Sequence, residues 1–450
     1  MKTLHLILLV FCSVCLVAQA AVQADVASFR QHAQQRNQEL NKAGYNFDFR
    51  CGVGKYEKPG NAHCAFVVPS GGAEQQLLFW VETNGGEARF LLVGPDEREV
   101  VSWSGKHGEQ VVVQSLRPGK HRLEIDSTGV DAGQALFCLK GNVVVAADLD
   151  PRRFQEIPAS SADGFYWPYI LFIPEHIKYP SLFVVPNNTG FATEDMDVLR
   201  GAASNDIKRE AELAERLGCP LLVPMFPRPP MKENDNLYLH ALSRESMLTT
   251  VVAWKRVDLQ LLQMVRNAQL LLGSRGIRSD GKLLLWGFSA AGSFVNRFAV
   301  LHPEHVLAVA GGGVGWPIAP VGEIEQERLR YPVGCSDLET FTGKPFDPVA
   351  LRAVKWFLFR GGDDGNDPVR FRDCYSETDA EVIRRRFGQT PIARWPQAQR
   401  LYSDAQLNAQ LVLYPGVGHT WTPAIREDIA QFFEKSLWEA IVEKNEPLSK

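Results

Sequence analysis

The chain has 450 residues, and its 48 basic and 52 acidic side chains give a formal net charge of −4. Hydrophobic residues make up 45% and charged residues 22%, which is typical of a soluble globular protein and excludes a disordered or low-complexity chain. The near-neutral balance gives no electrostatic footprint for nucleic acid. A chain of this length is expected to form two or three domains.

The first 20 residues have the pattern of a signal peptide. Lys2 supplies a positive charge, residues 6–17 form an apolar run too short to span a membrane, and Ala-Gln-Ala at 18–20 has the small-x-small spacing of a cleavage site. A buried N-terminal helix is the alternative. No later apolar stretch is long enough to cross a bilayer. We therefore expect an exported protein, secreted or periplasmic, without integral membrane association.

Two of the eight cysteines fall in this leader, which leaves six. An even number in an exported protein permits disulfides. Cys51 with Cys64 closes a short loop, and Cys335 with Cys374 is a second candidate pair, although six cysteines allow many pairings. No Cys-x-x-Cys or His-x-x-x-His spacing indicates a zinc site, and no metal is expected.

Residues 25–150 are predicted to form a helix followed by a small all-β domain. The polar segment 25–45 is typical of one helix. From 46 to 146, short apolar runs are separated by turn signals such as Gly-Gly and Arg-Pro-Gly-Lys, a pattern typical of an antiparallel β-sandwich. The runs are QLLFWVET, ARFLLVGP, EVVSWS, QVVVQSL and HRLEIDS.

Residues 150–165 contain Pro, Ser and Gly and are interpreted as a linker into a second domain, residues 165–445. In that domain apolar runs alternate with amphipathic segments, which predicts an α/β fold with a mostly parallel sheet covered on both faces. The strand-like runs are SLFVVP, PLLVPMF, KLLLWGFS, VLAVAGGG, KWFLFRGG and QLVLYPG, and the helical segments are near 194–218, 243–274, 291–302, 378–387 and 423–445.

One predicted strand-to-helix junction carries a candidate nucleophile. The sequence KLLLWGFSAAG, residues 282–292, places Ser289 at the corner between an apolar strand and a helix. A nucleophile elbow is so tight that the residues two before and two after the serine must be small, and Gly287 and Ala291 are small. The helix N-terminus that follows would face a developing oxyanion. The alternative is that Ser289 is only an N-cap residue.

Residues 166–445, the C-terminal two thirds of the chain, resemble the α/β-hydrolase superfamily through this junction and the segment HPEHVLAVAGGG that follows it. The resemblance is to secreted esterases and polyhydroxyalkanoate-depolymerase-like members, and the predicted β-sandwich resembles modules of exported bacterial hydrolases. The sequence departs from the G-x-S-x-G form because Ala291 stands at the second glycine. The resemblance implies the α/β-hydrolase fold and a serine, an acid and a histidine in that chain order. It does not indicate a substrate.

Three histidines follow Ser289, and one has the position that the resemblance implies for the general base. His419 comes after the last predicted strand and before the last helix, in YPGVGHTW. His302 and His305 bracket a loop expected at the opposite end of the sheet and are interpreted as surface residues. His240 precedes the serine and is not expected to be the base.

The acid should follow the preceding predicted strand, where three aspartates compete. The family pattern Gly-x-x-Asp with a later Pro aligns Gly361, Asp364 and Pro368, so Asp364 is the predicted acid, Asp367 the second candidate and Asp363 the third. An acidic loop of this kind could instead bind a cation through oxygen ligands.

An acyl-transfer site also needs two N–H donors for the oxyanion. The resemblance implies that one belongs to Ala290 and the other to the loop after the run at 181–186, where Asn188 and Thr189 are the candidates. The alternative for this loop is an ordinary Asn/Gly turn.

Several other residues lie beside the predicted catalytic positions. Phe288, Trp316 and Trp421 could line an acyl pocket or belong to the core. Residues 317–353 are an insertion that could form a small cap, and the loop 226–246 could edge the cleft.

These patterns predict an exported serine hydrolase that cleaves carboxylic esters, small or polymeric, through an acyl-enzyme intermediate. Ser289 is the expected nucleophile, His419 the base and Asp364 the acid, and no cofactor is expected. One alternative is a serine peptidase of the prolyl-oligopeptidase type, although the β-domain is short for a propeller. The other is a non-catalytic protein whose sandwich binds a polymer or carbohydrate. In the hydrolase itself, the sandwich is expected to bind a polymer or a protein partner.

Overall fold

The computed structural model divides the chain into two compact units, Met1–Asp148 and Leu149–Lys450. It describes residues 153–188, 192–230, 236–371 and 373–445 and, in the first unit, residues 35, 39, 87–105 and the remaining strands between 47 and 142. The predicted signal peptide 1–20 and almost all of the predicted helix 25–45 lie outside these residues.

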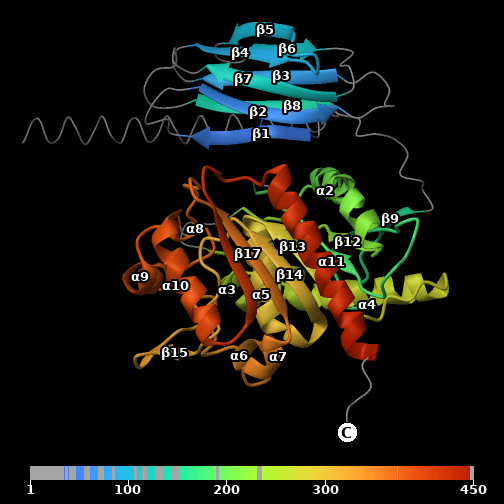
Figure 1. Ribbon diagram of the computed structural model, residues 1–450, viewed down its shortest axis with the longest axis vertical. Coiled ribbons are helices and arrows are strands. Elements are labelled where there is room, and N and C mark those ends of the chain that lie inside the picture. Colours follow the sequence, from blue (N-terminus) through green and yellow to red (C-terminus); the bar gives the residue numbers. More distant parts are fainter. Residues whose placement is uncertain are drawn as a thin grey trace, which may run out of the picture. The chain divides into compact units, whose positions relative to one another are not determined.

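The first unit contains two antiparallel sheets of four strands each, with the orders β1-β8-β3-β6 and β2-β7-β4-β5 (Figure 1). All five apolar runs predicted to be strands in this region are strands. The strands are β1 (Phe47–Gly54), β2 (Asn61–Val68), β3 (Gln76–Thr83), β4 (Ala88–Val93), β5 (Glu99–Gly105), β6 (Glu109–Val113), β7 (Gly119–Asp126) and β8 (Ala135–Asn142).

The second unit is built on a sheet of eight strands in the order β18-β17-β14-β13-β11-β12-β10-β9. Only β10 runs against its neighbours, and the remaining pairs are parallel. Numbered from β9, the strands follow the order 1-2-4-3-5-6-7-8. This arrangement, with helices connecting the parallel strands, confirms the predicted α/β-hydrolase fold.

The six predicted strands of this unit are present and have helices between them, whereas β9 and β10, which precede them, and α10 were not predicted (Figure 1). Among the described residues, every helix is too short or too polar to span a lipid bilayer. The strands are β9 (Phe154–Ile157), β10 (Tyr169–Phe172), β11 (Phe183–Val184), β12 (Leu221–Pro224), β13 (Leu283–Phe288), β14 (Val306–Gly312), β15 (Glu323–Ile324), β16 (Glu327–Arg328), β17 (Lys355–Gly361) and β18 (Asn408–Tyr414), and the α-helices are α2 (Met196–Leu217), α3 (Arg244–Leu248), α4 (Val257–Ser274), α5 (Ala290–Leu301), α6 (Glu339–Thr342), α7 (Pro348–Arg352), α8 (Pro368–Phe371), α9 (Glu377–Phe387), α10 (Pro391–Asp404) and α11 (Pro423–Asn445).

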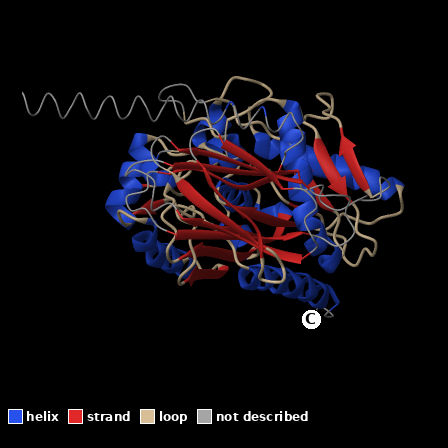
Figure 2. Cartoon of the chain, turned by 90° about the horizontal axis from the view of Figure 1, so that it is seen from above, coloured by secondary structure: helices blue, strands red, loops and turns tan. Residues whose placement is uncertain are grey.

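Helices cover both faces of this sheet because its central strands are apolar on both sides (Figure 2). In β13, Leu284 and Trp286 belong to the core formed with α2 and α11. Leu283 and Leu285 belong to the core formed with α4, α5 and α10. The period of two along a strand thus sorts one continuous apolar run into two cores.

Two predicted elements differ from the structure. The segment interpreted as a linker contains β9, which pairs with β10 at the edge of the sheet. The helix predicted over 243–274 is two helices, α3 and α4. The run Thr-Thr-Val-Val at 249–252 interrupts it with β-branched residues, and Arg256 takes a left-handed conformation (φ 51°) immediately before α4.

The predicted disulfide between Cys335 and Cys374 is absent, because both residues are buried free thiols. The Sγ of Cys335 donates to the carbonyl of Ala319 at 3.1 Å, and the Sγ of Cys374 accepts from Arg297 at 3.5 Å. Burial raises the pKa of both thiols. Each cysteine therefore packs at a separate position in the core. The even number of cysteines did not show which of them lie close together.

The predicted pair Cys51–Cys64 lies in the first unit, where its side chains are outside the described residues. The backbone register places Cys51 of β1 opposite Cys138 of β8. Cys64 of β2 lies in the other sheet, opposite Leu123 of β7.

The glycine before the β13–α5 turn gives a test of how tightly this turn is packed. A Cβ at Gly287 would lie 2.3 Å from the carbonyl oxygen of Ala291, so Gly287→Ala must displace backbone. We expect a loss of about 1–3 kcal/mol in the free energy of unfolding. Gly273→Ala is the matched control: Gly273 lies in α4 with no atom within 4 Å of the added Cβ, so we expect a gain of up to ~1 kcal/mol. Thermal unfolding of both variants checks the opposite signs, and equal shifts would contradict the steric argument.

Candidate active site

Ser289 occupies a strained turn between β13 and α5. Its φ of 60° and ψ of −119° lie outside the regions that non-glycine residues favour. The turn is held because the Ser289 N–H donates to the carbonyl of Gly312 at 2.8 Å and its own carbonyl accepts from Ser293 at 3.0 Å. The serine side chain makes no capping bond to α5, which does not fit the N-cap alternative.

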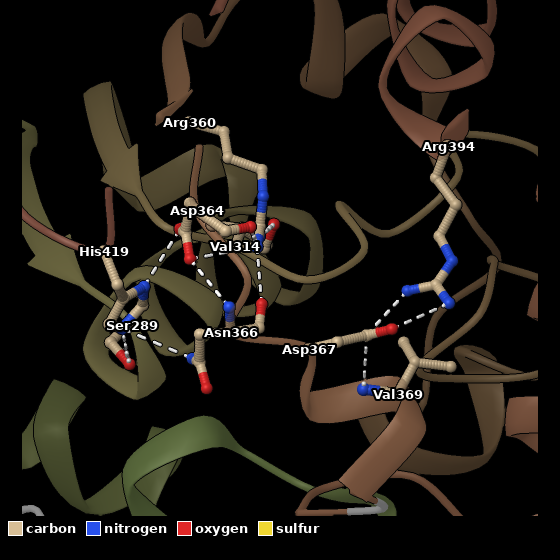
Figure 3. Close-up of polar contacts among 9 residues, drawn as sticks. All are labelled: Ser289, Val314, Arg360, Asp364, Asn366, Asp367, Val369, Arg394 and His419. Carbon is tan, nitrogen blue, oxygen red and sulfur yellow. Dashed lines mark hydrogen bonds and ion pairs between the residues drawn. The ribbon is translucent and has the colours of Figure 1, made fainter. Parts of the chain in front are cut away.

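Ser289, His419 and Asp364 form a continuous chain of hydrogen bonds (Figure 3). The Nε2 of His419 lies 3.0 Å from the Oγ of Ser289, and its Nδ1 lies 2.9 Å from Oδ2 of Asp364. A carboxylate can only accept, so Nδ1 carries the ring proton when the imidazole is neutral, and Nε2 is left as an acceptor. The His419 side chain is 31% exposed, whereas that of Asp364 is 1% exposed.

The three residues meet because each follows the carboxyl end of a parallel strand: β13, β17 and β18. Two backbone bonds tie the loop after β17 to the loop after β18: the Gly362 N–H donates to Tyr414 at 2.7 Å and the Asp363 N–H donates to Val417 at 3.0 Å. A Cβ at Gly361 would overlap the carbonyl of Val417, so glycine is required at this approach. These contacts fix the distance between the carboxylate and the imidazole.

Asp364 is also held by Arg360, which sequence reasoning did not identify. The guanidinium is fully buried and lies 3.2 Å from Oδ1 of Asp364. It also donates to the carbonyls of Val314, Asp364 and Asn366. Burial lowers the pKa of Arg360 below its usual value, while the charge of Asp364 acts in the opposite direction. The two carboxylate oxygens therefore have different partners: Oδ1 pairs with Arg360, and Oδ2 accepts from His419.

The competing aspartates have other partners. Asp367 receives two hydrogen bonds from Arg394 of α10, at 2.7 and 3.1 Å, and one from the backbone N–H of Val369. Asp363 is exposed. The two buried carboxylates of this loop thus face arginines of the same chain, an arrangement that does not favour the predicted cation-binding alternative.

Of the predicted oxyanion donors, the structure describes Ala290 and Asn188 but not Thr189. Ala290 is the first residue of α5, and the first N–H groups of a helix have no acceptor within it. Asn188 follows β11 at the same edge of the sheet, and Thr189 lies outside the described residues. The buried side chain of the preceding Asn187 binds both the N–H and the carbonyl of Phe226, at 3.0 and 2.9 Å. Asn187 thereby fixes the turn that presents Asn188.

Two of the three predicted aromatic residues lie beside the histidine. The ring of Phe288 lies 4.8 Å from both the His419 ring and the Trp421 ring, centroid to centroid. Trp316 is a core residue, because it is 1% exposed and stacks on Phe387 at 4.1 Å. The insertion 317–353 contributes Trp316's neighbours Ala319, Leu329 and Val333 to a core cluster that also contains Ala290.

The other histidines that the sequence analysis considered are not part of the hydrogen-bonded chain of Ser289, His419 and Asp364. His302 is 6% exposed and lies 2.8 Å from Asp258, so its interpretation as a surface residue is wrong; His305, in the same loop, is exposed. The Nε2 of the fully buried His240 donates to the carbonyl of Phe226 at 2.7 Å. Burial lowers the pKa of His240 to about 4, so this ring is neutral at physiological pH.

Because Asp367 is paired with the buried Arg394, we expect its substitution to lower the free energy of unfolding more than substitution of the exposed Asp363. Asp367→Asn would leave the Arg394 guanidinium buried and uncompensated, and we expect a loss of about 3–5 kcal/mol in the free energy of unfolding. The matched control Asp363→Asn removes the same charge from an exposed site of the loop and should change it by less than about 0.5 kcal/mol. Urea denaturation followed by tryptophan fluorescence measures both. Similar values for the two variants would show that the buried pair does not stabilise the fold.

Comparison with known proteins gives likenesses among solved structures only: no protein-family model matches the chain, and its sequence matches no curated protein. One similar structure is poly(aspartic acid) hydrolase-1 from Sphingomonas sp. KT-1, with 17% identity, a TM-score of 0.41, and coverage of 63% of this chain and 98% of that chain. A second is an arylesterase, with 12% identity, a TM-score of 0.35 and coverage of 63% and 84%. A third is a butyrate-bound esterase from Thermogutta terrifontis, with 13% identity, a TM-score of 0.35 and coverage of 67% and 98%. At these identities the similarities do not identify a substrate.

Proposed function

We propose that this protein is a serine hydrolase that cleaves carboxylic esters through an acyl-enzyme intermediate. The observation that carries the proposal is the hydrogen-bonded chain from Ser289 through His419 to Asp364, with the serine on a strained turn at a helix N-terminus. A serine hydroxyl becomes a useful nucleophile when a base accepts its proton and a third group orients that base. The three side chains have the contacts that these roles require.

In the first half of the reaction, Oγ of Ser289 attacks the ester carbonyl carbon as its proton passes to Nε2 of His419. The carbonyl oxygen becomes an oxyanion, which the N–H of Ala290 and a donor from the loop at Asn188 and Thr189 would stabilise. The imidazolium then gives the proton to the alkoxide oxygen as the carbon–oxygen bond breaks. The alcohol leaves, and the acyl group remains on Ser289.

In the second half, His419 accepts a proton from water, and the hydroxide oxygen attacks the acyl carbon. The second tetrahedral intermediate breaks its bond to Oγ of Ser289, which recovers the proton from His419, and the carboxylic acid leaves. Asp364 accepts from Nδ1 throughout, so it orients the ring and stabilises the imidazolium without itself taking the proton. This cycle needs no cofactor.

The site contacts do not by themselves distinguish an ester from an amide, because both reactions use the same three groups. The ring of Phe288 contacts His419 and the ring of Trp421 contacts Phe288, and this aromatic surface suits an apolar substrate group. We also infer export from the leader pattern at residues 1–20, and a polymer or protein partner for the β-domain of the first unit. Mass spectrometry of the mature N-terminus tests cleavage after Ala20.

Covalent labelling tests the nucleophile directly. A fluorophosphonate should modify wild-type protein at Ser289, identified by peptide mass spectrometry, because the reagent traps a serine activated by a neighbouring base. The Ser289→Ala variant should not be labelled. An unlabelled wild type, or equal labelling of the variant, would refute the enzyme proposal and favour a non-catalytic binding protein.

Substrate tests then distinguish the two classes of hydrolase. We expect turnover of p-nitrophenyl esters by the wild type and little turnover of peptide anilides. A preference for the anilides would favour the peptidase alternative. A panel of acyl lengths and polymeric esters would define the substrate further.

The assignment of the acid predicts a selective loss of activity. Asp364→Asn keeps the size of the side chain but removes the charge that orients Nδ1–H of His419, and we expect kcat to fall on the order of 10⁴-fold. The control Asp363→Asn, one residue earlier and exposed, should retain wild-type kcat. Steady-state kinetics on a p-nitrophenyl ester measure both variants. A fall in both, or in neither, would contradict the role of Asp364.

A further inference from the structure

The proton-accepting nitrogen of His419 has a second polar neighbour besides Ser289. The carboxamide nitrogen of Asn366 lies 3.3 Å from Nε2 (Figure 3). Sequence reasoning gave Asn366 no role beyond its place in the acidic loop. In the proposed reaction Nε2 is the atom that takes and returns the proton, so a group in contact with it can affect each proton transfer.

The backbone of Asn366 is hydrogen-bonded to both members of the ion pair between Arg360 and Asp364. Its backbone N–H donates to Oδ1 of Asp364 at 2.9 Å, and its carbonyl accepts from the Arg360 guanidinium. Both partners are buried. The main chain of Asn366 is therefore fixed from two sides, which brings its side chain to His419 without depending on contacts of the carboxamide itself.

A carboxamide is suited to both protonation states of the imidazole. Neutral Nε2 has a single lone pair, and the Oγ–H of Ser289 and the NH₂ group of Asn366 share it as donors in the orientation that the structure has. After Nε2 gains a proton, a half-turn about χ2 presents Oδ1, which accepts from the new N–H. The second bond involves a charged donor and is the stronger of the two. An aspartate at this position could only accept, and an alanine could do neither.

Resting on the proposed function, we propose that Asn366 is a positioning residue that donates to Nε2 of His419 before the serine is deprotonated and accepts from it once the proton has arrived. A carboxylate in its place would stabilise the imidazolium in the resting enzyme. The neutral amide adds no such charge to the resting enzyme and still stabilises the charge that develops during attack.

The charged groups near His419 lie away from Nε2. Asp364, paired with Arg360, faces Nδ1, and Asp363 lies exposed in the same loop. From α2, Arg209 lies over the ring of Trp421 at 5.5 Å and is paired with Asp206 and Glu210. Ser289 and Asn366 are the neutral groups at Nε2. Asn366 is thus the place where a single substitution adds a charge directly beside Nε2.

The test is the pH profile of kcat/KM for ester hydrolysis in the Asn366→Asp and Asn366→Ala variants. Activity requires neutral His419, so the rate rises with pH along an acidic limb. A new carboxylate favours the protonated ring, and we expect Asn366→Asp to move the midpoint of that limb upward by about one pH unit or more. For Asn366→Ala we expect kcat to fall roughly 5-fold, the equivalent of one lost hydrogen bond, with KM little changed. Partial unfolding of a variant would lower the activity at every pH and would not move the midpoint.

Asp363→Asn is the matched control, because it changes one charge in the same loop without contacting Nε2. Its midpoint should stay within about 0.3 pH units of the wild type, since an exposed charge is screened by solvent. An unmoved midpoint in Asn366→Asp, or an equal and opposite shift in Asp363→Asn, would overturn the proposal.

A second measurement separates this inference from the proposed function. NMR titration of the His419 ring, assigned with His419→Gln, reports protonation without any turnover. If fluorophosphonate labelling fails but the His419 titration midpoint still rises in Asn366→Asp, the contact with Asn366 stands and the hydrolase proposal fails. If labelling succeeds and the titration midpoint does not move, the hydrolase proposal stands and the role of Asn366 is refuted.

Discussion

The candidate site depends on the burial of one carboxylate. Asp364 is almost inaccessible to water, and an isolated carboxylate in such a place would be strongly destabilised. Three contacts compensate it: the Arg360 guanidinium, the backbone N–H of Asn366 and the Nδ1–H of His419. Each of these partners is thereby fixed as well. The orientation of His419 and the course of the loop after β17 follow from satisfying a single buried charge.

The candidate nucleophile Ser289 depends on a different constraint, the steric one at the β13–α5 turn. The main chain reverses so sharply that Ser289 has a positive φ and Gly287 meets the carbonyl of Ala291. Such strain persists only where surrounding packing holds it. Here β13 pairs with β11 and β14 in the middle of the sheet, and α5 packs between the sheet and the loops that follow it. The rigid centre of the fold therefore supports the strained residue.

The site residues whose positions follow from the order of strands along the chain could be predicted from the sequence. Parallel strands end at one edge, so residues placed after predicted strands could be expected to meet, as Ser289, Asp364 and His419 do. The Gly-x-x-Asp pattern ranked Asp364 above Asp367 but did not exclude Asp367, because the two differ in their arginine partners, Arg360 and Arg394. Arg394 lies in α10, which was not predicted, and its sequence contains Pro396. Nor could cysteine number reveal that Cys335 and Cys374 fill separate places in the core. Contacts between segments distant in sequence decide such cases.

The division of the Asp364 carboxylate has a consequence for acid–base chemistry at this site. Because Oδ1 serves Arg360 and Asn366, the negative charge is shared between a permanent cation and the imidazole. Arg360 thereby offsets part of the negative charge that Asp364 presents to the imidazole. The carboxylate still orients Nδ1–H through Oδ2, since orientation depends on the hydrogen bond and not on the whole charge. Asp364 thus both orients the imidazole and faces its charge on the Nδ1 side, whereas the half-buried neutral side chain of Asn366 is the group that we propose to act at Nε2.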